Sequence, residues 1–136
     1  MGRWYIPFSA IDPEHTERQW TVGIEEAHYT VLKHHGHEKQ IARLMLVKET
    51  LDDPIRIHKG WCRQDKEDSY VYVGKPTHDY RSLTIETPAP PGQLFLVFIL
   101  PGGTIDEWTW RPLAEKTPET PQGVEGEVIW QRPLKT

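Results

Sequence analysis

Residues 94–111 read LFLVFILPGGTIDEWTWR, and this stretch decides the expected fold. Its first part, Leu94 to Leu100, is continuously apolar, as expected of a central β-strand that is covered on both faces. Pro101-Gly102-Gly103 is a strong turn signal, and residues 104–111 follow it as a second strand. Because a link this short joins antiparallel neighbours, the stretch predicts the middle of an antiparallel sheet.

Three shorter segments ahead of this stretch have the alternating pattern of β-strands, namely residues 55–58, 70–73 and 82–86. Residues 128–130 are a further candidate, either for an edge strand or for a segment that docks on a partner. Counting the segments at 94–100 and 104–111, we expect a sheet of about five strands.

Two helices are predicted ahead of the sheet. Residues 24–35 place apolar side chains at helical spacing and end before Gly36, as helices often do before a glycine. Residues 37–51 repeat this pattern and end before Asp52-Asp53-Pro54, since proline cannot continue a helix. The predicted fold class is therefore α+β, with two N-terminal helices packed on a roughly five-stranded antiparallel sheet.

The length of 136 residues fits one domain. Within it we expect an irregular lead-in over residues 1–22, an α+β core over residues 23–112 and a Pro-rich tail over residues 113–136. The only cysteine, Cys62, excludes an intramolecular disulfide and fits the reducing cytoplasm. Because the longest apolar run is too short to span a bilayer, we expect no membrane association and a cytoplasmic location.

The charge balance gives two different indications. The formal net charge is −4, and nucleic-acid binders are usually basic, so the whole chain is not typical of that class. Between residues 56 and 81, however, six basic residues stand against four acidic ones. A local basic face on an acidic protein is therefore expected there.

The alternation of the predicted strands also separates two faces of the sheet. The aliphatic side chains are expected to face the helices: Ile55, Ile57, Val71, Val73, Leu83 and Ile85. The polar side chains would then share the other face: Arg56, His58, Tyr70, Tyr72, Thr84 and Glu86. Such a set can bind anions, stack on bases and transfer protons, although many antiparallel sheets have one solvated face without a function.

Four features together resemble the barnase–EndoU–colicin–RelE group of small ribonucleases, in its bacterial and phage members. These are a histidine on the first helix (His28), Asp53-Pro54 before the first strand, the segment YVYVGK at 70–75, and a last strand ending in EWTWR at 107–111. The resemblance covers about two thirds of the chain and excludes both ends.

The resemblance implies metal-independent cleavage of RNA without a cofactor, in which the ribose 2′-hydroxyl attacks the adjacent phosphorus. The catalytic candidates are His58, Tyr72, His28 and Arg111. The candidates for RNA binding are Arg56, Lys59, Lys75, Arg81, Trp108 and Trp110. Because toxins of this type are usually neutralised by another protein, an antitoxin-like partner is also expected.

Several of these residues have a purely structural alternative. His28 lies on the apolar stripe of its helix, which also fits a hydrogen-bonded core histidine. Trp108 and Trp110 alternate onto one face and also fit a pair that closes the sheet over the N-terminal aromatic residues. The histidines of segment 34–37 are not expected to hold a metal, because Gly36 breaks the helix between them.

Two other functions remain open. The first is a non-catalytic binding module, either immunity- or antitoxin-like or an accessory subunit, that uses the Trp- and Pro-rich ends as an interface. The acidic net charge favours this hypothesis. The second is a small-molecule enzyme with a pocket between the helices and the sheet.

Overall fold

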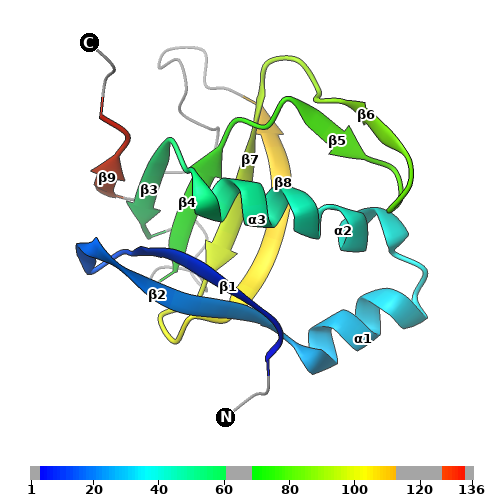
Figure 1. The fold of residues 1–136 in the computed structure, drawn as a ribbon, viewed down its shortest axis with the longest axis horizontal. Coiled ribbons are helices and arrows are strands. Elements are labelled where there is room, and N and C mark those ends of the chain that lie inside the picture. Colours follow the sequence, from blue (N-terminus) through cyan, green and yellow to red (C-terminus); the bar gives the residue numbers. More distant parts are fainter. Residues whose placement is uncertain (1–3, 61–68, 113–126, 134–136) are drawn as a thin grey trace.

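The computed structural model describes residues 4–60, 69–112 and 127–133. Its centre is a five-stranded sheet in the order β8-β7-β4-β3-β9, antiparallel throughout (Figure 1). These strands are β3 (Arg56–Lys59), β4 (Tyr70–Gly74), β7 (Gln93–Ile99), β8 (Ile105–Pro112) and β9 (Glu127–Gln131). The predicted α+β class and the antiparallel five-stranded sheet are confirmed. Cys62 and most of the predicted tail, residues 113–126 and 134–136, lie outside the described residues.

The described chain begins with a long β-hairpin, so the irregular lead-in predicted for residues 1–22 is wrong. β1 (Trp4–Asp12) pairs antiparallel with β2 (His15–Glu25). Along β1, Ile6, Phe8 and Ala10 alternate into the core. Pro7 obscures this pattern in the sequence, but in the described structure β1 pairs on one side only, where a proline is tolerated.

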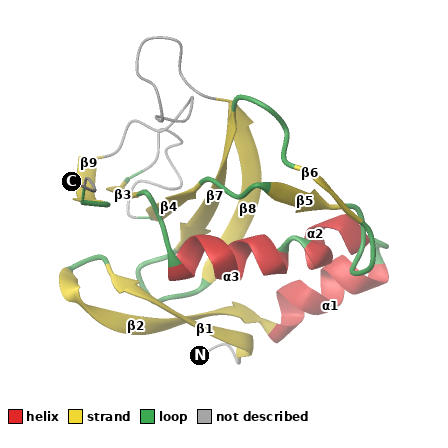
Figure 2. Ribbon diagram, turned by 45° about the horizontal axis from the view of Figure 1, so that its top comes forward, coloured by secondary structure: helices red, strands yellow, loops and turns green. Residues whose placement is uncertain are grey.

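Three described helices follow the hairpin, so the prediction that the helices come first is also wrong. They are α1 (Glu26–His34), α2 (Glu38–Ala42) and α3 (Leu44–Asp52). The second predicted helix, residues 37–51, is divided at Arg43, which caps both α2 and α3. α3 packs across the sheet and buries Leu46, Val47 and Leu51 (Figure 2). No helix in the described ranges is long and apolar enough to cross a membrane.

The predicted strand at 82–86 does not belong to the main sheet. β5 (His78–Tyr80) and β6 (Glu86–Pro88) form a separate two-stranded ribbon, and residues 81–85 make the turn between them. Leu83 and Ile85, which were expected to face the helices, are 67% and 51% exposed. β9 takes the fifth place in the sheet instead, beside β3, so of the two alternatives for residues 128–130 the structure shows the edge strand.

The two faces of the sheet carry two separate apolar clusters. The larger one lies between the sheet, the hairpin and the helices. Its sheet residues include Ile57, Tyr70, Tyr72, Phe95, Val97, Ile99 and Trp108. The smaller one lies on the opposite face of the sheet, and its members Val71, Val73, Leu94, Leu96 and Phe98 are fully buried.

The orientation of β4 is therefore the reverse of the expected one. Tyr70 and Tyr72 point toward the hairpin, while the valines point away from it. The hairpin supplies the polar partners that buried phenols need: Tyr72 donates to the Ile11 carbonyl and accepts from Trp20 Nε1 at 3.0 Å. Tyr70 donates to the Glu14 carboxylate. Because those partners come from a segment expected to be irregular, sequence alternation alone gave the wrong face.

Candidate functional site

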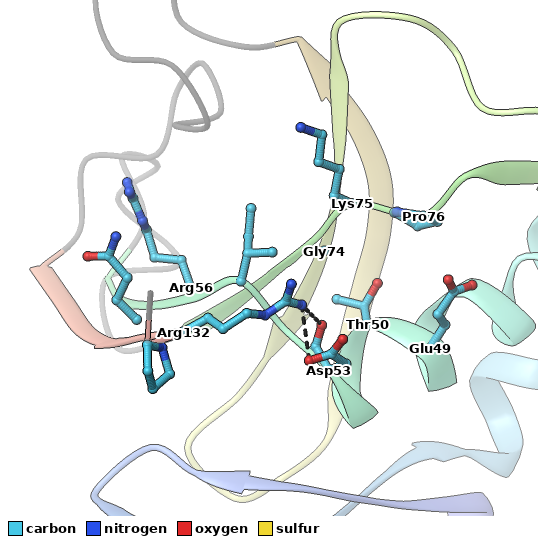
Figure 3. A pocket seen from close by; sticks show the side chains of 11 residues that line it. Glu49, Thr50, Asp53, Arg56, Gly74, Lys75, Pro76 and Arg132 are labelled. Carbon is cyan, nitrogen blue, oxygen red and sulfur yellow. Dashed lines mark hydrogen bonds and ion pairs between the residues drawn. The ribbon is translucent and has the colours of Figure 1, made fainter. Parts of the chain in front are cut away.

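A polar cleft of about 470 Å³ lies where the end of α3, the end of β4 and the end of β9 meet. Figure 3 shows the side chains that line this polar cleft. It is lined by Glu49, Thr50, Asp53, Ile55, Arg56, Gly74, Lys75, Pro76, Gln131, Arg132 and Pro133. Three cationic side chains and two carboxylates stand around it, which is a cationic excess on a protein of net charge −4.

Local sequence explains why the backbone opens here. Pro54 prevents α3 from continuing past Asp52, so the chain turns sharply into β3. Ile55 stands at this turn, where its N–H donates to the Val73 carbonyl at 2.8 Å and its carbonyl accepts from the Arg132 N–H at 3.0 Å. The cleft is therefore bordered by the end of α3 and by the ends of β4 and β9, and the backbone of Ile55 is hydrogen-bonded to both strand ends.

Arg132 reaches from the end of β9 to Asp53 across the cleft (Figure 3). Its Nη2 donates to the Asp53 carbonyl at 2.7 Å and lies 3.0 Å from the Asp53 carboxylate. Its Nε is buried and has no hydrogen-bond partner among the described residues. The guanidinium is thus fixed by one nitrogen while a second donor is left unsatisfied.

Thr50 is the second unsatisfied group. It is 1% exposed, and within the described part of the chain its hydroxyl has no hydrogen-bond partner. It packs directly on Gly74, where an added Cβ would lie 2.8 Å from Thr50 Cγ2 and closer still to the hydroxyl oxygen. Gly74 is therefore required for this close approach of α3 to β4.

A carboxylate–imidazole pair borders the cleft on the helix side. Glu49, which lines the cleft, has a carboxylate oxygen 3.6 Å from His78 Nε2. The other ring nitrogen of His78 lies 3.8 Å from Glu86. This arrangement can transfer a proton at the margin of a cationic site.

Of the predicted site residues, the structure brings Arg56 and Lys75 together in the polar cleft. Both had been assigned to RNA binding, and Lys75 is exposed to solvent. A role in binding RNA stays a prediction for both residues.

The central catalytic candidates do not share one surface. Tyr72 faces the hairpin and is fully buried, and this burial raises its pKa far above the ordinary value. His58 is 2% exposed and is paired with Val71, so it lies on the opposite face of the sheet. The expected continuous polar face with both residues is therefore not formed.

The remaining candidates are dispersed. Lys59 is engaged with the hairpin tip, its Nζ lying 3.1 Å from Glu14. Arg81 is exposed in the turn between β5 and β6. Arg111 is opposite Leu94, on the same face of the sheet as His58, and Trp110 packs edge-on against Phe95 at 5.3 Å between ring centroids. None of these four side chains lines the polar cleft.

His28 and Trp108 meet at a second, smaller hollow. Their rings are 5.4 Å apart, and a space of about 230 Å³ is lined by these two residues with Leu32, Gln40 and Glu107. The Trp108 indole donates to the Gln40 carbonyl at 3.0 Å and is 5% exposed. Trp108 and Trp110 both pack on the larger cluster, so the predicted placement of the two tryptophans on one face is confirmed.

Sequence reasoning missed Glu49, Thr50, Asp53, Gly74 and Arg132, which line the cleft, and His78, which lies beside Glu49. One signal was available in the segment YVYVGK, where a glycine ends a strand and precedes a lysine. The contribution of residues 131–133 had no local signal, because it depends on the pairing of β9 with β3.

In the described ranges, no group of three or more His, Cys, Asp or Glu side chains is arranged to hold a metal ion. The sequence matches no protein-family model, and searches of curated proteins and of solved structures find no significant match.

Proposed function

We propose that this protein is a binding module that holds an anionic group of its ligand, a phosphate in first place, in the polar cleft. The observation that carries the proposal is that the cleft combines three cations, Arg56, Lys75 and Arg132, with a buried Thr50 hydroxyl that has no hydrogen-bond partner in the described ranges. Arginine forks and hydroxyl donors are the groups that proteins use for phosphate oxygens. This places the non-catalytic binding module ahead of the nuclease among the functions considered.

The test is a titration of the protein with inorganic phosphate. Calorimetry measures the affinity, and amide chemical shifts locate the binding site. We expect binding to weaken roughly five-fold in Lys75→Gln, equivalent to about 1 kcal/mol. Arg81→Gln is the matched control, because Arg81 is an exposed cation that does not line the cleft. Equal loss in both variants, or shift changes away from α3, β4 and β9, would reject the proposal.

A second candidate is the metal-independent endoribonuclease that the family resemblance implies. One observation favours it: the Glu49–His78 pair stands at the margin of the cationic cleft, where it could serve as base and acid. The placement of His58 and Tyr72 on opposite faces of the sheet counts against it. If the protein is such a nuclease, we also propose an antitoxin-like protein partner that neutralises it.

Incubation with total RNA in EDTA separates the two functions. Cleavage by the wild type that is lost in Glu49→Gln and in His78→Ala, but not in His58→Ala, would support a nuclease at the cleft. Cleavage lost only in His58→Ala would return the activity to the opposite face of the sheet. Intact RNA at high protein concentration supports the binding module.

A further inference from the structure

We infer that the polar cleft takes a small phosphate monoester, a phosphorylated sugar or nucleotide, rather than the diester backbone of a nucleic acid. This inference rests on the proposed function, because it names the ligand class of the same site. Three features of the cleft support it, namely its charge arrangement, its unsatisfied donors and the space beyond them.

The charges favour one concentrated anion over a chain of anions. A phosphate monoester carries close to two negative charges at neutral pH, whereas each diester of a nucleic acid carries one. Glu49 and Asp53 are both exposed at the α3 side of the cleft. Asp53 is paired with Arg132, but a diester backbone that ran along this side would bring a second phosphate near Glu49, which repels it, whereas a monoester has no second phosphate.

The unsatisfied donors match a terminal phosphate. A buried donor without a partner destabilises the free protein, so a ligand oxygen that reaches it relieves this penalty on binding. Thr50 Oγ1 and Arg132 Nε both belong to this cleft, and neither has a hydrogen-bond partner among the described residues. Asp53 already fixes the Arg132 guanidinium through Nη2, so little side-chain entropy is lost when an anion arrives.

The rest of the cleft suits an organic group. A volume of about 470 Å³ falls within the roughly 300–1,000 Å³ of small-molecule sites and exceeds the need of an inorganic anion. Ile55, Pro76 and Pro133 give it apolar walls, and Gln131 adds an amide that can donate and accept. A sugar or base ring attached to the phosphate would find both packing surface and a polar partner there.

Calorimetry with four probes tests the inference: inorganic phosphate, ribose 5-phosphate, AMP and the diester ApA. We expect one of the two monoesters to bind at least ten-fold more tightly than inorganic phosphate and than ApA. A preference for ribose 5-phosphate or for AMP identifies the organic group. Equal affinity for phosphate and both monoesters, or tightest binding of ApA, would overturn the inference while leaving the proposed function intact. If none of the four probes binds, both the inference and the proposed function are rejected.

Two variants locate the site. Thr50→Val keeps the shape of the side chain and removes a buried hydroxyl that has no partner within the described residues, so we expect an unchanged or higher melting temperature but roughly ten-fold weaker monoester binding. Thr30→Val, on the exposed surface of α1, is the matched control. Arg132→Lys keeps the charge and removes Nε, and it should weaken binding at least as much. Wild-type affinity in a folded Thr50→Val protein would contradict the assignment.

Discussion

The two ends of α3 carry polar clusters of opposite character. At its start, Arg43 and Asp79 form a two-fold hydrogen-bonded ion pair, with Nε to Oδ1 at 3.1 Å and Nη2 to Oδ2 at 3.0 Å. At its end, in the polar cleft, Thr50 and Arg132 each keep a buried donor without a partner in the described residues. The first cluster is complete and joins elements of the fold, whereas the second is incomplete, as a ligand site is before its ligand binds.

The carboxyl group of Asp79 shows how complete the first cluster is. Burial on its own raises the pKa of Asp79, but hydrogen bonds from Arg43 and from the Tyr80 N–H outweigh burial and hold the pKa below its ordinary value. The folded state therefore favours the ionised carboxylate. Its contribution to stability is present above the unfolded pKa and is lost as the pH falls through the folded one.

The largest expected effect comes from breaking the complete cluster. Asp79→Asn leaves the Arg43 guanidinium nearly buried without a counter-charge, which we expect to lower the free energy of unfolding by about 2–3 kcal/mol. Urea denaturation measures this change. Phosphate binding at the other end of α3 should be unaffected once the protein is folded.

A double variant provides the control for this prediction. Arg43→Met with Asp79→Leu removes both charges together, so it should cost less than Asp79→Asn alone. If the two proteins are equally destabilised, the loss comes from packing rather than from an uncompensated charge. The contrast between the two ends of α3 would then be weaker than proposed.

A smaller effect tests the packing at the incomplete cluster. Gly74→Ala places a methyl group within 3 Å of Thr50, and overpacking of this kind costs about 1–3 kcal/mol. Gly102→Ala is the control, because a Cβ at Gly102 meets no atom within 4 Å. Thermal unfolding of both variants measures the difference. An unchanged melting temperature for Gly74→Ala would mean that α3 can move away from β4 at no cost.

The sequence predicts some strands of the fold better than others. β7 and β8 were found because a continuous apolar run, a glycine turn and an alternating segment are all local signals. The β1–β2 hairpin was missed although Trp20, Val22 and Ile24 alternate along β2, because prolines and charged residues around them resemble a loop. Local pattern therefore identified β7, which is buried on both faces, together with β8, which follows it after a clear turn signal, and missed the more exposed β1–β2 hairpin.

The candidate site was harder to predict than the fold. Arg56 and Lys75 were expected to bind an anion, and the structure places both at the polar cleft. Arg132 and Thr50 could not be found, because they meet only through the pairing of β9 with β3 and the packing of α3 on β4. Tyr72 was assigned to the wrong face because a partner for its hydroxyl, Ile11, comes from β1.

The smallest expected effect concerns Glu14 at the tip of the hairpin, whose carboxylate is exposed but has hydrogen-bond partners. Glu14 accepts from Tyr70 and Lys59, and these two hydrogen bonds hold its pKa below the ordinary value of 4.5. Its contribution to stability is therefore present above pH 4.5 and disappears as the pH falls through the lowered pKa. We expect Glu14→Gln to be slightly less stable than wild type at pH 7 and equal to it in strong acid, and Glu17→Gln on β2 is the matched control variant. Urea denaturation across this pH range measures the free energy of unfolding of each protein. If the difference between wild type and Glu14→Gln stays constant with pH, the ionised carboxylate does not hold the hairpin to β3 and β4.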